Sequence, residues 1–287
     1  MRTHGYKVLA VLLAVVLTLS LAGCGNRGTP ASESSSSQDE SSPYSSVLYL
    51  NPIKAPDEFL GGVLRPKLTE QVKGAKEDNK DTVGWLQVPG TIIDDVVVQS
   101  KDNDYYLRKN FDLRYSDNGI YYADFRVKYG AKANENSRNM VLYGHSMNDN
   151  PDDTGEPLFT QLKRYLKEDF AKENPYIFFS TENGDYAYEV FAVYFTDIDV
   201  NYNDPNLSDA DFMNIISEAN KSSWQIYEGI DVSASDHIIT LSTCCYNIVS
   251  SYPNKYRYVV MGRLVPDGEA LKETANVKQN PNPKMPK

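Results

Sequence analysis

Short apolar segments rich in β-branched and aromatic residues recur through the middle of this chain, and Pro, Gly, Asn or Asp separates one from the next. Segments of this kind are typical of strands joined by turns. We expect strands at residues 83–88, 96–99, 119–124, 139–143, 176–180, 186–195, 237–242 and 256–265. A set of about eight such strands favours a β-barrel or a β-sandwich.

Three segments show signs of helix instead of strand. Residues 64–75 form a weak candidate, whereas residues 158–170 and 208–221 place apolar side chains at helical spacing. The last of these segments begins at Ser208, a residue type that caps helices. We therefore predict one mainly β domain at residues 51–267, with helical insertions.

Residues 1–24 have the composition of an export segment. Two basic residues precede an apolar stretch at 8–22, which is shorter than the roughly 20 residues of a spanning helix. The stretch ends in LAGC at residues 21–24, which resembles a bacterial lipobox, so we predict cleavage and lipidation at Cys24. The alternative is an uncleaved signal-anchor in which Cys24 has no role. Either places the domain on the extracellular face of the cytoplasmic membrane.

Composition separates the predicted domain from its flanks. Residues 25–50 are rich in Ser and Glu and predict a flexible linker, and residues 268–287 predict a disordered tail. In the whole chain, 39 acidic residues outnumber 29 basic ones, for a formal charge of −10. This acidic balance argues against a nucleic-acid partner.

Beyond the export segment the chain has only two cysteines, Cys244 and Cys245, which are adjacent. Their Cα atoms are therefore about 3.8 Å apart, below the usual range for a disulfide. Cys244 lies at the end of an apolar strand, where a reactive thiol could project, and Cys245 would point to the opposite face. The alternative for Cys244 is a buried structural cysteine.

A reactive thiol needs a basic partner. His237 begins the strand that leads to Cys244, so roughly 23 Å of extended chain separates the two. His145 follows a different predicted strand and is therefore the candidate, with a surface loop histidine as the alternative. Arg257 opens the next strand, and its guanidinium could hold an oxyanion if that strand runs back beside Cys244. A solvated charge is the alternative for Arg257.

Together these residues resemble a known family. The sequence TLSTC at 240–244 matches the TLxTC signature of the sortases, which is followed after a loop by an arginine in their last strand. NMVLYGHSM at 139–147 resembles the segment that carries the sortase histidine in class B, and VGWLQVPGT at 83–91 resembles the class B opening strand. Two further segments extend the match, DNDYYL at 102–107 and GIYYAD at 119–124. The resemblance covers about residues 81–265.

The resemblance implies a closed eight-stranded sortase barrel with extra helices, and a cysteine transpeptidase or endopeptidase without cofactor or metal. Cys244 would attack the carbonyl after Thr in the C-terminal sorting motif of a surface protein, forming a thioester. His145 would protonate the leaving amine and then deprotonate an amine of a peptidoglycan precursor or cross-bridge. Arg257 would steady the oxyanion. Ser242 and Thr243 would contact the sorting peptide.

The chain departs from the family pattern at three points. Many class B sortases have an acid two positions beyond the cysteine, where this chain has Tyr246. The short loop after the cysteine leaves both Arg257 and Arg263 open as the catalytic arginine. Sortases also usually keep an uncleaved N-terminal anchor, whereas this chain has a lipobox at Cys24.

Four other functions compete with this interpretation. A papain-like hydrolase places Cys before His, whereas His145 precedes Cys244 here. An L,D-transpeptidase has both residues in one short Gly-containing motif, which this chain lacks. A metal site is disfavoured because adjacent cysteines lack the usual C-x₂₋₄-C spacing. A non-catalytic surface lipoprotein that binds a ligand fits the lipobox but does not explain His145, Cys244 and Arg257 in sortase order.

Overall fold

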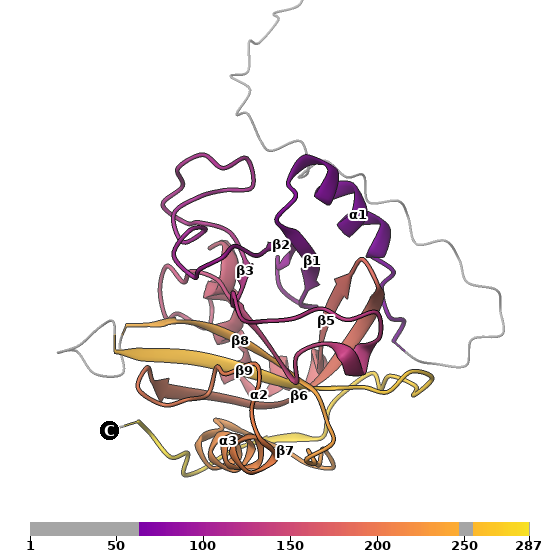
Figure 1. Ribbon diagram of the computed structural model, residues 1–287. Coiled ribbons are helices and arrows are strands. Elements are labelled where there is room, and N and C mark those ends of the chain that lie inside the picture. The colour runs from indigo at the N-terminus through magenta and orange to yellow at the C-terminus, as the bar shows by residue number, and fades with distance from the viewer. Residues whose placement is uncertain (1–62, 247–254, 287) are drawn as a thin grey trace, which may run out of the picture. The chain divides into compact units, whose positions relative to one another are not determined.

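The computed structural model describes residues 63–246 and 255–286 (Figure 1). The predicted export segment at 1–24, with Cys24, and the predicted linker at 25–50 lie outside these residues. None of the helices in the described part of the chain has the length and apolar character that a bilayer crossing requires.

Eight strands close into a barrel, which the family resemblance implies and which decides between the barrel and the sandwich that the strand pattern leaves open. Their order around the barrel is β1-β2-β3-β4-β8-β9-β6-β5. They are β1 (Thr82–Gln87), β2 (Asp94–Val98), β3 (Tyr122–Ala123), β4 (Asn139–Tyr143), β5 (Tyr176–Thr181), β6 (Gly184–Asp197), β8 (Ile238–Cys245) and β9 (Tyr256–Leu264). Neighbouring strands are antiparallel except for β2 with β3 and β4 with β8, which are parallel.

The long strand β6 shows why several strand segments are apolar almost throughout. Tyr188 and Val190 belong to the core inside the barrel. Phe191 and Tyr194 belong to a second apolar cluster that contains the buried side of α3 (Asp209–Ser222). A strand covered on both faces needs apolar residues at successive positions, so strict alternation is lost.

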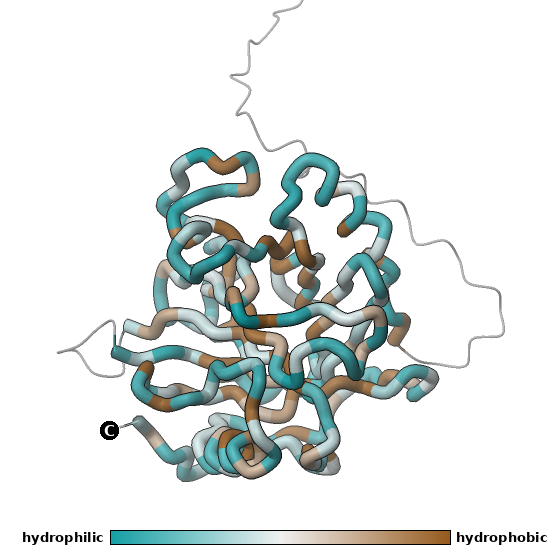
Figure 2. Tube along the Cα trace, in the orientation of Figure 1, coloured by the Kyte–Doolittle hydropathy of each residue, from teal (hydrophilic) through white to brown (hydrophobic). Residues whose placement is uncertain are grey.

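Two predicted helices are present with shifted ends. α1 spans Thr69–Asp78 and buries Val72 and Ala75 against the outer face of β1 and β2, while the rest of this helix is mainly hydrophilic (Figure 2). α3 begins after Ser208, whose Oγ accepts a hydrogen bond of 3.2 Å from the Asp211 backbone N–H. This contact is the helix cap that the sequence predicts.

The third predicted helix, at 158–170, is divided into two elements. A 3₁₀ helix, η2, spans Leu158–Leu166 and is followed by the short α-helix α2 at Glu168–Glu173. Side chains three positions apart along η2 are fully buried: Phe159, Leu162 and Tyr165. This spacing matches the three residues per turn of a 3₁₀ helix, so tight winding keeps one face of η2 in the core.

The strand predicted at 119–124 is shorter than expected, because only β3 is paired within it. Gly119 precedes β3 with a φ of 63°, a backbone conformation that favours glycine. A Cβ atom at Gly119 would lie 2.7 Å from the carbonyl oxygen of Leu107. Glycine therefore allows this turn and the Leu107 backbone to approach closely.

A short 3₁₀ helix, η1 (Ala133–Glu135), follows β3.

The prediction of a disordered tail at 268–287 is wrong for the part that the structure describes, which ends at residue 286. β10 (Val277–Gln279) pairs antiparallel with β7 (Gln225–Tyr227), and neither strand was predicted. Leu271 and Ala275 are both buried, with 5% of each residue exposed. The few apolar residues of this segment are sufficient to order it, because β7, which is distant in the sequence, pairs with β10.

Candidate active site

Three adjacent strands bring the predicted catalytic residues to one end of the barrel. In the antiparallel pair β8–β9, Cys244 lies directly opposite Arg257. In the parallel pair β4–β8, Tyr143 lies opposite Ser242. His145 comes two positions after Tyr143, and Cys244 comes two positions after Ser242. His145, Cys244 and Arg257 accordingly line one cavity of about 320 Å³.

The strand register distinguishes the two candidate arginines. Arg263 pairs with Ile238 at the opposite end of β8, six positions along β9 and roughly 20 Å from the Arg257 position. Its Nη2 lies 3.8 Å from the Glu189 carboxylate, whereas Arg257 lines the cavity that contains Cys244. Arg257 is therefore the arginine beside the thiol.

The imidazole of His145 is half-buried and is held by a backbone carbonyl. Its Nε2 lies 2.8 Å from the carbonyl oxygen of Leu107, so Nε2 carries the proton and donates. Burial lowers the pKa of His145 below its ordinary value, the Leu107 hydrogen bond opposes that shift, and the charge of Arg108 adds to it. The side chain of Tyr246, two positions beyond Cys244, donates its hydroxyl proton to the Ser146 carbonyl at 2.7 Å. The sequence did not predict Leu107 as the group that orients His145.

The adjacent cysteines have opposite surroundings, as strand alternation predicts. Cys244 is partly exposed and lines the cavity. Cys245 is 1% exposed, and its Sγ lies 3.5 Å from Oδ2 of Asp149. Only Cys244 is therefore accessible to a substrate in the cavity.

Ser242 and Thr243 also line the cavity, but both hydroxyls have partners within the protein. The Ser242 Oγ and the Tyr202 hydroxyl are 2.9 Å apart. Thr243 donates to the Gly144 carbonyl at 2.7 Å, directly before His145. Both residues are buried, with 2% of each exposed, so little of either side chain faces the cavity. The Thr243 hydrogen bond ties β8 to the end of β4.

A hydrogen-bonded wall beside the cavity centres on the fully buried carboxylate of Asp124. It accepts from the Arg126 guanidinium at 2.8 and 2.9 Å and from the Tyr143 hydroxyl at 2.9 Å. Asn103 donates to it at 3.0 Å. Burial alone would raise the pKa of Asp124, but these hydrogen bonds outweigh burial and lower it. The sequence did not predict this wall, because its members come from separate segments with no fixed spacing.

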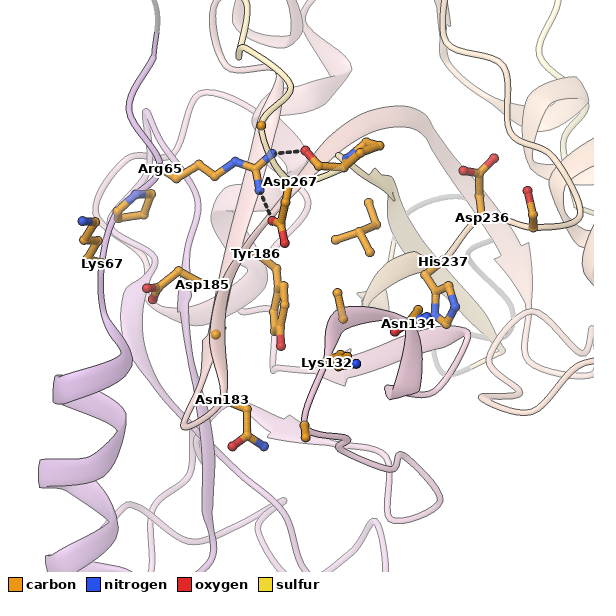
Figure 3. A pocket seen from close by; sticks show the side chains of 18 residues that line it. Arg65, Lys67, Lys132, Asn134, Asn183, Asp185, Tyr186, Asp236, His237 and Asp267 are labelled. Carbon is orange, nitrogen blue, oxygen red and sulfur yellow. Dashed lines mark hydrogen bonds and ion pairs between the residues drawn. The ribbon is translucent and has the colours of Figure 1, made fainter.

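A second cavity of about 810 Å³ contains none of the three candidate catalytic residues (Figure 3). It is lined by His237, which precedes β8, and by Arg65, whose Nη1 donates to Asp267 at 3.1 Å. His237 and Cys244 thus lie at opposite ends of β8, as the sequence predicts. Within the described residues, no group of three or more His, Cys, Asp or Glu side chains could hold a metal ion.

Comparisons with known proteins match most of the barrel to one family. The Sortase domain family matches residues 86–265. The chain is 35% identical over 204 residues to Sortase B of Listeria monocytogenes, which covers 69% of this chain and 76% of that protein. It is 32% identical over 175 residues to Sortase B of Staphylococcus aureus, covering 61% and 67%.

Solved structures show the same similarity. A Staphylococcus aureus sortase B–substrate complex superposes with a TM-score of 0.59 at 29% identity, covering 70% of this chain and 87% of that chain. A mutant form of Clostridium perfringens sortase B superposes with a TM-score of 0.60 at 30% identity, covering 69% and 87%. The similarity therefore extends over the barrel that carries the cavity.

Proposed function

Because the chain belongs to the sortase family and is a class B cysteine transpeptidase, we propose that Cys244 cleaves a C-terminal sorting motif after Thr. The observation that carries this proposal is the strand register that places Cys244 opposite Arg257, with His145 at the end of the neighbouring strand. A nucleophile, a proton carrier and a fixed cation then face one cavity.

In the first half of the reaction, the Cys244 thiolate attacks the carbonyl carbon after Thr, and a C–S bond forms. The carbonyl oxygen becomes an oxyanion, which the Arg257 guanidinium stabilises. Protonated His145 gives its proton to the leaving amine as the C–N bond breaks. The products of this half are a thioester on Cys244 and the released C-terminal segment.

In the second half, an acceptor amine attacks the thioester and His145 takes its proton. The C–S bond breaks, the new amide forms, and Cys244 returns as a thiolate. One solved relative is a sortase B complexed with triglycine, which supports a glycine-type amine at the end of a peptidoglycan cross-bridge or precursor as the acceptor. The substrates are then surface proteins with a C-terminal sorting motif.

The test is a transfer assay with the full-length protein, a panel of sorting-motif peptides and triglycine. We expect at least one peptide to be cut after Thr and joined to triglycine, with both products identified by mass spectrometry. A covalent peptide adduct on Cys244 should accumulate when triglycine is withheld. A panel in which no peptide is cut and no adduct forms would contradict the proposal.

We expect Arg257→Lys to lower kcat by on the order of 10²–10³, with a smaller change in KM, because an oxyanion-stabilising donor acts mainly in the transition state. Lysine keeps the charge but loses the planar pair of donors. Arg263→Lys is the matched control and should be near normal, since Arg263 pairs with Glu189 at the other end of β9. The reverse pattern in steady-state kinetics would assign the role to Arg263.

We also propose that the domain is held on the extracellular face of the cytoplasmic membrane through a lipid on Cys24. A single acyl chain binds membranes weakly, whereas two or more anchor stably. Mass spectrometry of the mature N-terminus should show a lipid-modified Cys24 as the first residue. A Cys24→Ala variant should not acquire this group. An intact Met1 or Arg2 on the isolated protein would favour an uncleaved signal-anchor instead.

A further inference from the structure

A completely buried lysine lies directly behind the candidate nucleophile. Lys163 belongs to η2 and is 0% exposed. Its Nζ donates to the Cys244 carbonyl at 3.1 Å and lies 3.2 Å from Oδ1 of Asp149. It also donates to the Ser146 hydroxyl at 2.5 Å and the Asn148 carbonyl at 3.2 Å. Four oxygen atoms thus surround the three N–H donors of the ammonium group.

The second oxygen of Asp149 extends this contact to the residues that follow Cys244. Oδ2 accepts from the Tyr246 backbone N–H at 2.6 Å and lies 3.5 Å from the Sγ of Cys245. The ion pair therefore joins two segments, the loop directly after His145 and the end of β8. Side-chain exposure is 0% for Lys163 and 10% for Asp149, so solvent screens the pair weakly.

The rest of η2 holds the histidine side of the site. The Phe159 backbone N–H donates to the His145 carbonyl at 2.9 Å, and the Thr160 hydroxyl accepts from the Met147 backbone N–H at 2.8 Å. One largely buried element thus contacts the backbone of both His145 and Cys244. The distance between the imidazole and the thiol depends on these contacts as well as on the β4–β8 pairing.

Fold stability alone does not explain a buried ion pair at this position. Removing two charges from water is costly, and a well-packed apolar pair often replaces a buried ion pair without loss of stability. Burial lowers the pKa of Lys163, and Asp149 opposes that shift, so the ammonium charge of Lys163 depends on the neighbouring Asp149. What the pair provides, and apolar side chains cannot, is directional bonding to the Cys244 carbonyl and the Tyr246 N–H.

We propose that Lys163, paired with Asp149, is a positioning residue that sets the Cys244 thiol against the His145 imidazole. This inference rests on the proposed function, in which these two groups exchange a proton with the substrate. A misplacement of about 1 Å at a reacting group can cost on the order of 10² in rate. The effect should appear in kcat more than in KM, because the pair does not line the cavity.

The test compares Lys163→Met, Asp149→Asn and the double variant in the full-length protein. Each single variant leaves one buried charge uncompensated and should lower the melting temperature. The double variant removes both charges and should melt closer to the wild type than either single variant. Its kcat should nevertheless stay on the order of 10²-fold low, with KM within about twofold. Recovery of kcat along with stability would mean a purely structural role and would overturn the proposal.

Glu189→Gln is the matched control. Glu189 is a carboxylate with 3% exposure, paired with Lys272 at 3.3 Å, and it lies opposite Arg263, far from the thiol. This variant should lose stability without a change in kcat. A drop in kcat equal to that of the double variant would show that any lost buried pair slows the enzyme, and would count against Lys163.

A second readout does not depend on a peptide substrate. Iodoacetamide should alkylate Cys244 several-fold more slowly in the double variant than in the wild type, because a displaced thiol no longer lies beside the imidazole that accepts its proton. Mass spectrometry confirms that Cys244, and not Cys245, carries the label. An unchanged alkylation rate would overturn the inference. Slower alkylation in a protein whose wild type transfers no peptide would support the positioning role and contradict the proposed function.

Discussion

Cys244→Ala should abolish both cleavage of a sorting-motif peptide and formation of its covalent adduct, while the barrel stays folded. In the proposed mechanism the Cys244 sulfur forms the thioester bond, so the methyl group of alanine cannot replace it. Its loss should cost little stability, because Cys244 is partly exposed at the end of β8. Peptide turnover and far-ultraviolet circular dichroism of the variant measure the two effects.

Cys245→Ala is the matched control for this experiment. Cys245 has the same chemistry one residue away, but it is buried and faces Asp149 instead of the cavity. We therefore expect this variant to retain turnover, with any cost confined to stability. An inactive Cys245→Ala protein together with an active Cys244→Ala protein would show that the nucleophile is misassigned.

The second large effect is expected for His145→Ala, which should lose peptide transfer with the fold intact. A general acid–base group contributes typically 10²–10⁴ in rate, and in the proposed mechanism one imidazole serves both halves of the reaction. Because His145 is only half-buried at the end of a strand, its removal deletes little packing. Steady-state kinetics and thermal melting of the purified variant separate loss of turnover from loss of fold.

His237→Ala provides the comparison, since it removes a histidine of similar burial from the opposite end of the same barrel. It should transfer peptide at the wild-type rate. Wild-type turnover by His145→Ala would contradict the acid–base role. A loss of turnover in His237→Ala with an unchanged melting curve would show that the second cavity takes part in the reaction.

Local patterns in the sequence predict the barrel strands and the candidate residues of the site, while the choice of a closed barrel over a sandwich came from the resemblance to the sortases. Apolar runs between turn residues predict the eight strands, because the apolar pattern of a buried strand can be recognised from consecutive positions in the sequence. Because strand side chains alternate between the two faces, Cys244 and Cys245 point in opposite directions. The length of the extended strand between His237 and Cys244 excludes His237 as a partner of the Cys244 thiol. The order of His145, Cys244 and Arg257 within family motifs then indicates the class of reaction.

Other features depend on which distant segments meet, and only the tertiary structure decides these. Leu107 contacts His145 across 38 positions, and Lys163 contacts Cys244 across 81. The choice of Arg257 over Arg263 follows from the β8–β9 register, and the order of the C-terminal segment follows from the pairing of β10 with β7. No local spacing encodes such contacts, because they arise when the barrel closes and brings strand ends and loops together. The sequence by itself thus determined the barrel strands and the candidate catalytic groups, and the tertiary structure decided which contacts hold those groups in place.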